Sequence, residues 1–109
     1  MEKRLTARIR SIEPGAIKGQ RIVEASYEGG SLKFDLIGDL LEVGEGDVIE
    51  IVITDSKPED LDPYQFCGRG YLVPSGGGKE IFSVWGILFR FEPGLGLEVD
   101  REYFLCIKR

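Results

Sequence analysis

Four carboxylates stand close together in the stretch DSKPEDLD, and a hard cation is the ligand that such a cluster could bind. Asp55, Glu59, Asp60 and Asp62 offer the oxygen atoms that Ca²⁺ and Mg²⁺ prefer. The stretch lacks the central glycine and the terminal glutamate of a calcium-binding loop. Glycoside hydrolysis needs two carboxylates at a defined separation, and a loop sequence alone does not establish that separation. We therefore interpret the stretch as a solvated acidic loop and predict neither a metal nor a cofactor.

Two glycine-rich stretches resemble phosphate-binding loops only superficially. SGGGK, residues 75–79, lacks the spacing of a P-loop, and a predicted strand follows it in place of the helix that would hold the anion. PGLGLE, residues 93–98, also lacks the dinucleotide-binding spacing and opens no helix. The chain contains no histidine, so Ser-His and Cys-His nucleophile pairs are excluded. We predict that the chain has no catalytic residues of its own.

The two cysteines, Cys67 and Cys106, each lie within a predicted strand. Two thiols without histidine cannot supply the four ligands of a structural zinc site. A disulfide is possible if the two strands are neighbours, but disulfides are rare in a reducing compartment. We favour buried apolar packing for both side chains.

Length and charge limit the class of protein. The 109 residues predict one domain, residues 1–109, and the charged start MEKR lacks the apolar core of a signal peptide. No apolar run approaches the roughly 20 residues of a membrane span, so we expect a cytoplasmic protein. The net charge of −5 divides into +3 for residues 1–34, −9 for 35–66 and +1 for 67–109. This distribution is unfavourable for a protein that must neutralise phosphates by itself.

The elements that must position all these residues are short strands separated by glycine-rich turns. Alternating apolar and polar residues, typical of half-buried strands, recur at spacings of roughly 8–15 residues. The segments expected to form strands are Arg4–Ile12, Arg21–Glu28, Ser31–Ile37, Val48–Thr54, Gln65–Pro74, Ile81–Phe91 and Arg101–Lys108. A two-residue turn at Gly29-Gly30 should join the second to the third, and Leu40-Leu41 could form one helical turn. We predict an all-β protein, a sandwich or a small antiparallel barrel of seven or eight strands.

The stretch IFSVWGILFRF, from Ile81 to Phe91, is apolar on both faces, which is unusual for a strand with one wet side. A bulge at Trp85-Gly86 would turn Phe82 and Val84 inward before it, and the later phenylalanines inward after it. The bulge would leave Ile81, Trp85 and Leu88 facing outward. Such a trio is typical of a docking surface, unless Trp85 packs beneath the barrel's own loops.

Several segments in this order resemble a known family: YEGGSLKFDLIGDL, VGEGDVIEIVI, QFCGRGYLV, SVWGILFR and LEVDREYFLCIKR. They resemble subunit 8 (also called the G subunit) of archaeal DNA-directed RNA polymerase, which is similar to the eighth common subunit of the eukaryotic nuclear polymerases. The resemblance implies an OB-like antiparallel β-barrel with a non-catalytic role in transcription. It also implies docking on the largest subunit, with contact near the assembly-platform subunits, and no ligand for the catalytic magnesium.

Two departures from this family limit what can be transferred. The eukaryotic relatives carry a long acidic insertion where this chain has only Asp55–Tyr64. They also have a Tyr-Gly-Gly run where this chain reads Val84-Trp85-Gly86, so one glycine is replaced by the largest side chain. Contacts that depend on either feature are therefore not expected here.

We predict a partner interface of five residues: Ile81, Trp85, Leu88, Phe104 and Cys106. Phe104 and Cys106 should face outward, because they alternate along the last strand with Tyr103, Leu105 and Ile107, which should face the core. The alternative is a stand-alone barrel that binds single-stranded nucleic acid through aromatics and interleaved arginines. Most of the aromatic residues occupy expected core positions, and the arginines form no dense cluster. No direct nucleic-acid binding is therefore expected of the isolated chain.

Overall fold

A computed structural model describes residues 1–38, 40–73 and 75–109 of the chain. Among these residues there are eight strands and no helix, so none is long and apolar enough to cross a membrane. The strands are β1 (Glu2–Pro14), β2 (Gln20–Tyr27), β3 (Gly30–Ile37), β4 (Val48–Thr54), β5 (Phe66–Val73), β6 (Glu80–Val84), β7 (Ile87–Glu92) and β8 (Glu102–Lys108).

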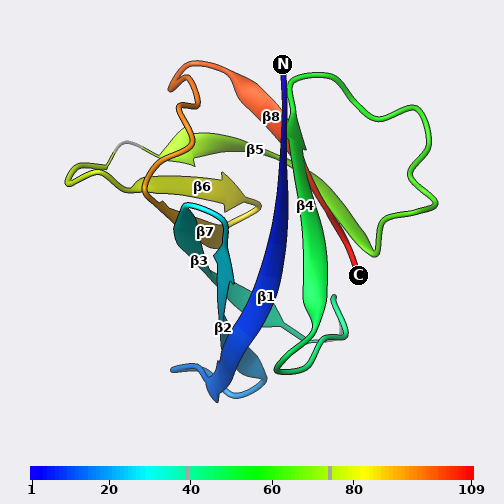
Figure 1. Cartoon of the computed structure of the whole chain (residues 1–109), viewed down its shortest axis with the longest axis vertical. Coiled ribbons are helices and arrows are strands. Elements are labelled where there is room, and N and C mark those ends of the chain that lie inside the picture. The colour runs from blue at the N-terminus through cyan, green and yellow to red at the C-terminus, as the bar shows by residue number, and fades with distance from the viewer. Residues whose placement is uncertain (39, 74) are drawn as a thin grey trace.

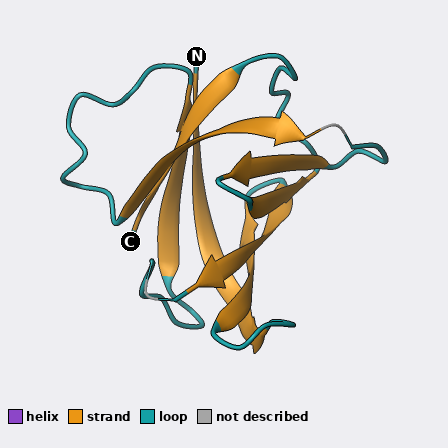
Figure 2. Cartoon of the chain, turned by 180° about the vertical axis from the view of Figure 1, so that it is seen from behind, coloured by secondary structure: helices purple, strands orange, loops and turns teal. Residues whose placement is uncertain are grey.

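The strands close into one antiparallel barrel. Their order around it is β1-β2-β3-β7-β6-β5-β8-β4, and β4 pairs again with β1. Figure 1 shows β1 and β4 side by side along the length of the barrel, and Figure 2 shows the same barrel from behind, built of strands and loops. The prediction of an all-β antiparallel barrel is confirmed.

The core follows the predicted alternation along the strands. Ala7 and Ile9 of β1 are buried, as are Val23 and Ala25 of β2, while the residues between them face outward. The largest fully buried side chains are aromatic and aliphatic residues: Tyr103, Phe34, Phe82, Phe89, Phe91, Ile9, Leu32, Ile49, Ile51, Ile53, Leu105 and Ile107. The interior is thus filled with side chains and contains no channel for a ligand among the described residues.

Three local predictions were wrong or fall outside the described residues. The turn between β2 and β3 is Glu28-Gly29, because Tyr27 pairs with Gly30. Gly30 lies inside the sheet, where a Cβ would come 2.7 Å from the Glu92 carbonyl oxygen. Leu40-Leu41 forms no helical turn. The predicted end of the fifth strand, Pro74, lies outside the described residues.

The stretch from Ile81 to Phe91 is a hairpin, so the predicted single strand with a bulge is wrong. Val84 of β6 pairs with Ile87 of β7, and only Trp85 and Gly86 lie between them. Both turn residues have positive φ, 55° and 88°. Such two-residue turns match the twist of the paired strands. The prediction of inward-facing residues was nevertheless correct: Phe82 and Val84 before the turn are buried, and so are Ile87, Phe89 and Phe91 after it. A two-residue turn shifts the inward positions from even to odd residue numbers, as a bulge would.

Cys67 and Cys106 lie directly opposite each other on β5 and β8, with their Cα atoms 4.0 Å apart. The structure joins them in a disulfide. The prediction of two unpaired, buried thiols is therefore corrected. The sequence could not show that these strands are neighbours, because 39 positions separate the two cysteines.

A single carboxylate holds the glycine-rich loop between β7 and β8. Glu80 accepts hydrogen bonds from the backbone N–H groups of Leu95 at 2.7 Å, Gly96 at 3.0 Å and Leu97 at 3.2 Å. Leu97, held in this way, is buried in the core. Three consecutive N–H groups of PGLGLE thus bind the protein's own carboxylate and are not free to bind a phosphate.

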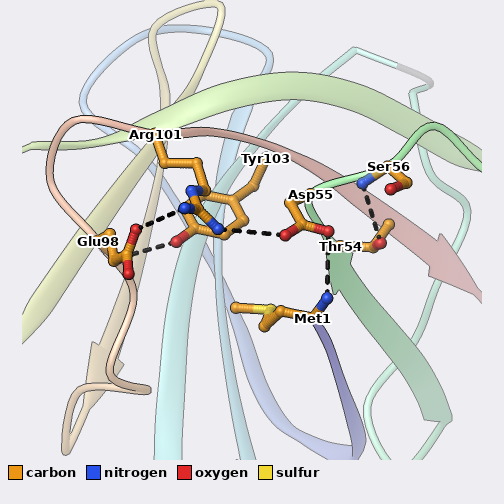
Figure 3. Close-up of polar contacts among 7 residues, drawn as sticks. All are labelled: Met1, Thr54, Asp55, Ser56, Glu98, Arg101 and Tyr103. Carbon is orange, nitrogen blue, oxygen red and sulfur yellow. Dashed lines mark hydrogen bonds and ion pairs between the residues drawn. The ribbon is translucent and has the colours of Figure 1, made fainter.

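Ionic contacts join the N-terminus to the loops on either side of it at one end of the barrel (Figure 3). The N-terminal amino group of Met1 lies 3.2 Å from Asp55 Oδ1, and Arg101 lies 3.3 Å from Asp55 Oδ2. Arg101 also pairs with Glu98 at 3.1 Å, and the backbone N–H of Glu98 donates to the Tyr103 hydroxyl. The hydrogen bond from the amino group is the main cause that lowers the pKa of Asp55.

We expect this network to make stability depend on pH in the acid range. A carboxylate with a lowered folded-state pKa stabilises the fold above its unfolded pKa of about 3.9, and that contribution is lost as pH falls through the folded value. The difference in unfolding free energy between the wild type and Asp55→Asn should thus be full at about pH 6 and decrease below about pH 4. Urea titrations at several pH values measure it, and a pH-independent difference would contradict this role for Asp55.

Candidate protein-docking surface

The exposed tryptophan at the β6–β7 turn is the most unusual residue on the surface. Trp85 is 72% exposed and is the one non-glycine residue with positive φ in the described part of the chain. Asn, Asp and Gly are the residues that two-residue turns with positive φ favour, and a bulky residue there costs about 1–3 kcal/mol. Tryptophan at this position is therefore unfavourable in two ways: its backbone φ is positive, and its large apolar side chain is exposed to water.

A series of aromatic rings supports Trp85 from inside the barrel. The Trp85 ring lies edge-on to Phe66, with ring centroids 6.1 Å apart. Phe66 lies 6.5 Å from Phe89, and Phe89 stacks on Phe34 at 5.2 Å. Phe34 and Phe89 belong to the buried core. One side of the indole is thus held against the barrel while most of its surface remains open to solvent.

The outer face of strands β5, β6 and β7 carries a second group of apolar side chains, beyond the contact that the indole makes with Phe66. Tyr71 pairs with Ser83, which pairs with Leu88; in the next row, Val73 pairs with Ile81. Tyr71 is 54% exposed, whereas Ser83 at the centre is only 5% exposed. We define the outer strip as Trp85 together with these side chains: Tyr71, Val73, Ile81, Ser83 and Leu88.

The five residues predicted for the interface do not all reach this surface. Trp85 is exposed, and Ile81 and Leu88 are half-buried members of the outer strip. Phe104 is half-buried on the outer face of β8, opposite Arg69 of β5. Cys106 also points outward by register, but it is 0% exposed and bonded to Cys67. Cys106 is therefore withdrawn from the candidate interface, because a partner could not contact it in this conformation.

Sequence reasoning missed Tyr71 and Val73, which complete the outer strip. The signal was present in QFCGRGYLV, where Gly68 and Gly70 occupy the inward phase and are buried. Tyr71 and Val73 share the opposite phase with Arg69, which is exposed. Following that alternation through the two glycines would have placed Tyr71 on the outer face.

The acidic loop does not form a metal site in the described residues. No group of three or more carboxylate or thiol side chains converges there. Asp55 is paired with the N-terminal amino group and Arg101, and the side chain of Asp60 accepts a hydrogen bond from the backbone of Asp62. The SGGGK stretch is a turn between paired strands β5 and β6, as predicted, with positive φ at Gly77 and Gly78.

The aromatic residues do not form a stacking platform for nucleic acid. Phe82, Phe89 and Phe91 are buried in the barrel. Among the described aromatics only Tyr71 and Trp85 are strongly exposed, which leaves two rings for stacking with bases. A basic groove beside them is also needed for binding single strands. Arg69 on the outer face of β5 lies 3.9 Å from Glu102, and the basic residues Lys33, Lys79 and Arg90 share their hollow with Glu24 and Glu92, so the basic charge near the aromatics is largely balanced.

Comparison with known proteins identifies the family. A model of the family of DNA-directed RNA polymerase G subunits (RpbG) matches residues 3–109. The chain belongs to this family. A similar curated protein is DNA-directed RNA polymerase subunit Rpo8 of Saccharolobus solfataricus, 28% identical over 121 aligned positions that cover 96% of this chain and 91% of the relative. The chain is thus an archaeal-type RNA polymerase subunit, as the resemblance implied.

The match to the RpbG family includes all eight strands, since it begins in β1 and ends after β8. The outer strip and Trp85 therefore lie inside the region shared with the family. Membership in the family does not say which face of the barrel contacts other polymerase subunits. The outer strip is the candidate for that face.

Proposed function

We propose that this barrel is a non-catalytic accessory subunit that docks on the largest polymerase subunit through the outer strip. Contact with the neighbouring assembly-platform subunits extends this interface. Nucleotide addition resides in other chains of the enzyme. The barrel stabilises the assembly by protein–protein contacts and supplies no catalytic group.

The observation that carries the proposal is the exposed, strained Trp85. A residue that is unfavourable for both its backbone conformation and its solvation points to a role other than folding. Burial of a tryptophan in a partner pocket contributes about 2–4 kcal/mol at interface hot spots. The half-buried apolar residues Leu88, opposite Ser83 near the turn, and Ile81, farther along β6, would extend the contact on the outer face.

The test replaces Trp85 by the residue that its turn prefers. Trp85→Asn should leave the stability of the isolated barrel within about 1 kcal/mol of the wild type, because the relief of positive φ offsets the loss of the contact with Phe66. Binding to the purified largest subunit should weaken by about 30- to 1,000-fold, the equivalent of 2–4 kcal/mol. Titration with the purified subunit measures the affinity, and urea unfolding measures the stability of the free variant.

Ile17→Asn is the matched control, because Ile17 is also 72% exposed but lies in the β1–β2 loop. This variant should bind like the wild type. Equal binding by Trp85→Asn and the wild type would refute docking through the outer strip. Equal loss in both variants would indicate a general effect of polarity and would also contradict the proposal.

Single-stranded nucleic acid is the alternative ligand for such a barrel. The net charge of −5 and the buried aromatics argue against it. We expect negligible binding of a single-stranded oligonucleotide by the isolated chain at any salt concentration. Micromolar affinity that falls steeply with salt would favour the alternative.

A further inference from the structure

Two basic residues face each other beside the outer strip. Lys33 of β3 pairs directly with Arg90 of β7, and Arg90 pairs on its other side with Ile81 of the strip. Like charges placed directly opposite across a sheet are unfavourable. The arrangement is conspicuous in a chain whose net charge is −5. The fold therefore places its basic pair at the edge of its apolar surface.

These basic groups have no ionic partner within the described residues. The ion pairs found there involve Arg4, Arg69, Arg101, Arg109 and the N-terminal amino group, but neither Lys33 nor Arg90. Arg90 is nevertheless half-buried. With Lys79 they line a shallow hollow of about 220 Å³, which is also lined by Glu92 and by Glu24, the residue paired with Lys33 on β2. Burial without a partner is unfavourable for a guanidinium group, so a carboxylate at this position would be favoured.

We propose that the surface that covers the outer strip presents a carboxylate to the pair Lys33–Arg90. This inference rests on the proposed docking function and adds to it the chemistry of the partner: an apolar pocket for Trp85 flanked by an acidic segment. The planar guanidinium of Arg90 can bind a carboxylate through two parallel hydrogen bonds. Covering Arg90 without such a group would bury an unpaired charge, which is strongly unfavourable. The acidic group thus sets the orientation in which the strip docks.

Substitutions of Arg90 test this inference. Arg90→Glu should weaken binding to the purified largest subunit by about tenfold or more, as expected for a close charge pair. Arg90→Gln should bind more weakly than the wild type and show a shallower decrease in affinity as salt rises. The free Arg90→Gln variant should be no less stable than the wild type, because the substitution removes the repulsion from Lys33. A merely structural role for Arg90 would instead lower stability.

Trp85 provides the readout and Lys18 the control. Trp85 is the single tryptophan of the chain, so its emission should shift to shorter wavelength when the partner covers it. Lys18→Glu makes the same change of net charge on the exposed β1–β2 loop and should leave the affinity unchanged. Equal weakening by Lys18→Glu and Arg90→Glu would overturn the inference in favour of a general charge effect.

The outcomes separate the inference from the docking proposal. Normal binding by Arg90→Glu together with lost binding by Trp85→Asn would overturn the acidic partner and leave docking through the strip intact. Normal binding by both variants would overturn both. If the wild type bound a single-stranded oligonucleotide and Arg90→Glu abolished that binding, the basic pair would serve nucleic acid and the inference would be wrong.

Discussion

Gly70→Ala should lower the unfolding free energy by about 3–4 kcal/mol, one of the largest effects of any single substitution in this barrel. A Cβ on Gly70 would overlap the carbonyl oxygen of Ser83 and lie 3.0 Å from the Phe82 ring. The carbonyl belongs to a strand backbone and cannot rotate away as a flexible side chain would. Residues 66–71 of β5 pair with β8, and residues 71–73 pair with β6. Gly70 lies where the pairing with β6 begins, so the backbones of β5 and β6 come close together there.

Gly76→Ala is the matched control for this prediction. A Cβ on Gly76 would meet nothing within 4 Å, and its φ is not in the left-handed region. This variant should stay within about 0.5 kcal/mol of the wild type. Urea unfolding followed by circular dichroism measures both variants. Equal stability of the two would mean that β5 does not cross β6 as closely as described.

Phe89→Ala should destabilise the barrel by about 3–5 kcal/mol, the usual range for a buried phenylalanine. Phe89 is 2% exposed and contacts both Phe34 and Phe66. Its loss would leave a cavity between the core and the ring that supports Trp85. The emission of Trp85 should therefore also change in the variant, which a loss of stability alone would not produce under native conditions.

Phe104→Ala provides the comparison for Phe89→Ala. Phe104 is only half-buried on the outer face of β8, so its truncation should cost clearly less, about 1–2 kcal/mol. Urea unfolding gives both values under the same conditions. Equal losses would contradict the assignment of Phe89 to the core and of Phe104 to the outer face.

Most strand positions could be predicted because the side-chain period of a half-buried strand is directly visible in the sequence. Val23 and Ala25, and the residues facing them on β3, alternate strictly and are buried as expected. The hairpin at Trp85-Gly86 was missed for a physical reason. Tryptophan is a poor residue for positive φ, so local rules disfavoured a two-residue turn at the position where one occurs.

The candidate interface was predicted only in part, because exposure depends on neighbours that are distant in sequence. Trp85, Ile81 and Leu88 were identified from an excess of apolar residues on one segment. Tyr71 and Val73 joined them only when β5 was placed beside β6. Cys106 had the correct phase, but its burial and its bond to Cys67 depend on the pairing of β5 with β8.

The sequence by itself determined most of the strands, the inward phase of each, the absence of a histidine-based catalytic group and the resemblance to a polymerase subunit family. All of these depend on residue types and on spacings of a few positions. The tertiary structure alone decided the order of strands around the barrel, the disulfide, the outer strip and the placing of Lys33 opposite Arg90. The reason is that a closed barrel brings together strands far apart in the chain, and local alternation carries no information about which strand lies beside which.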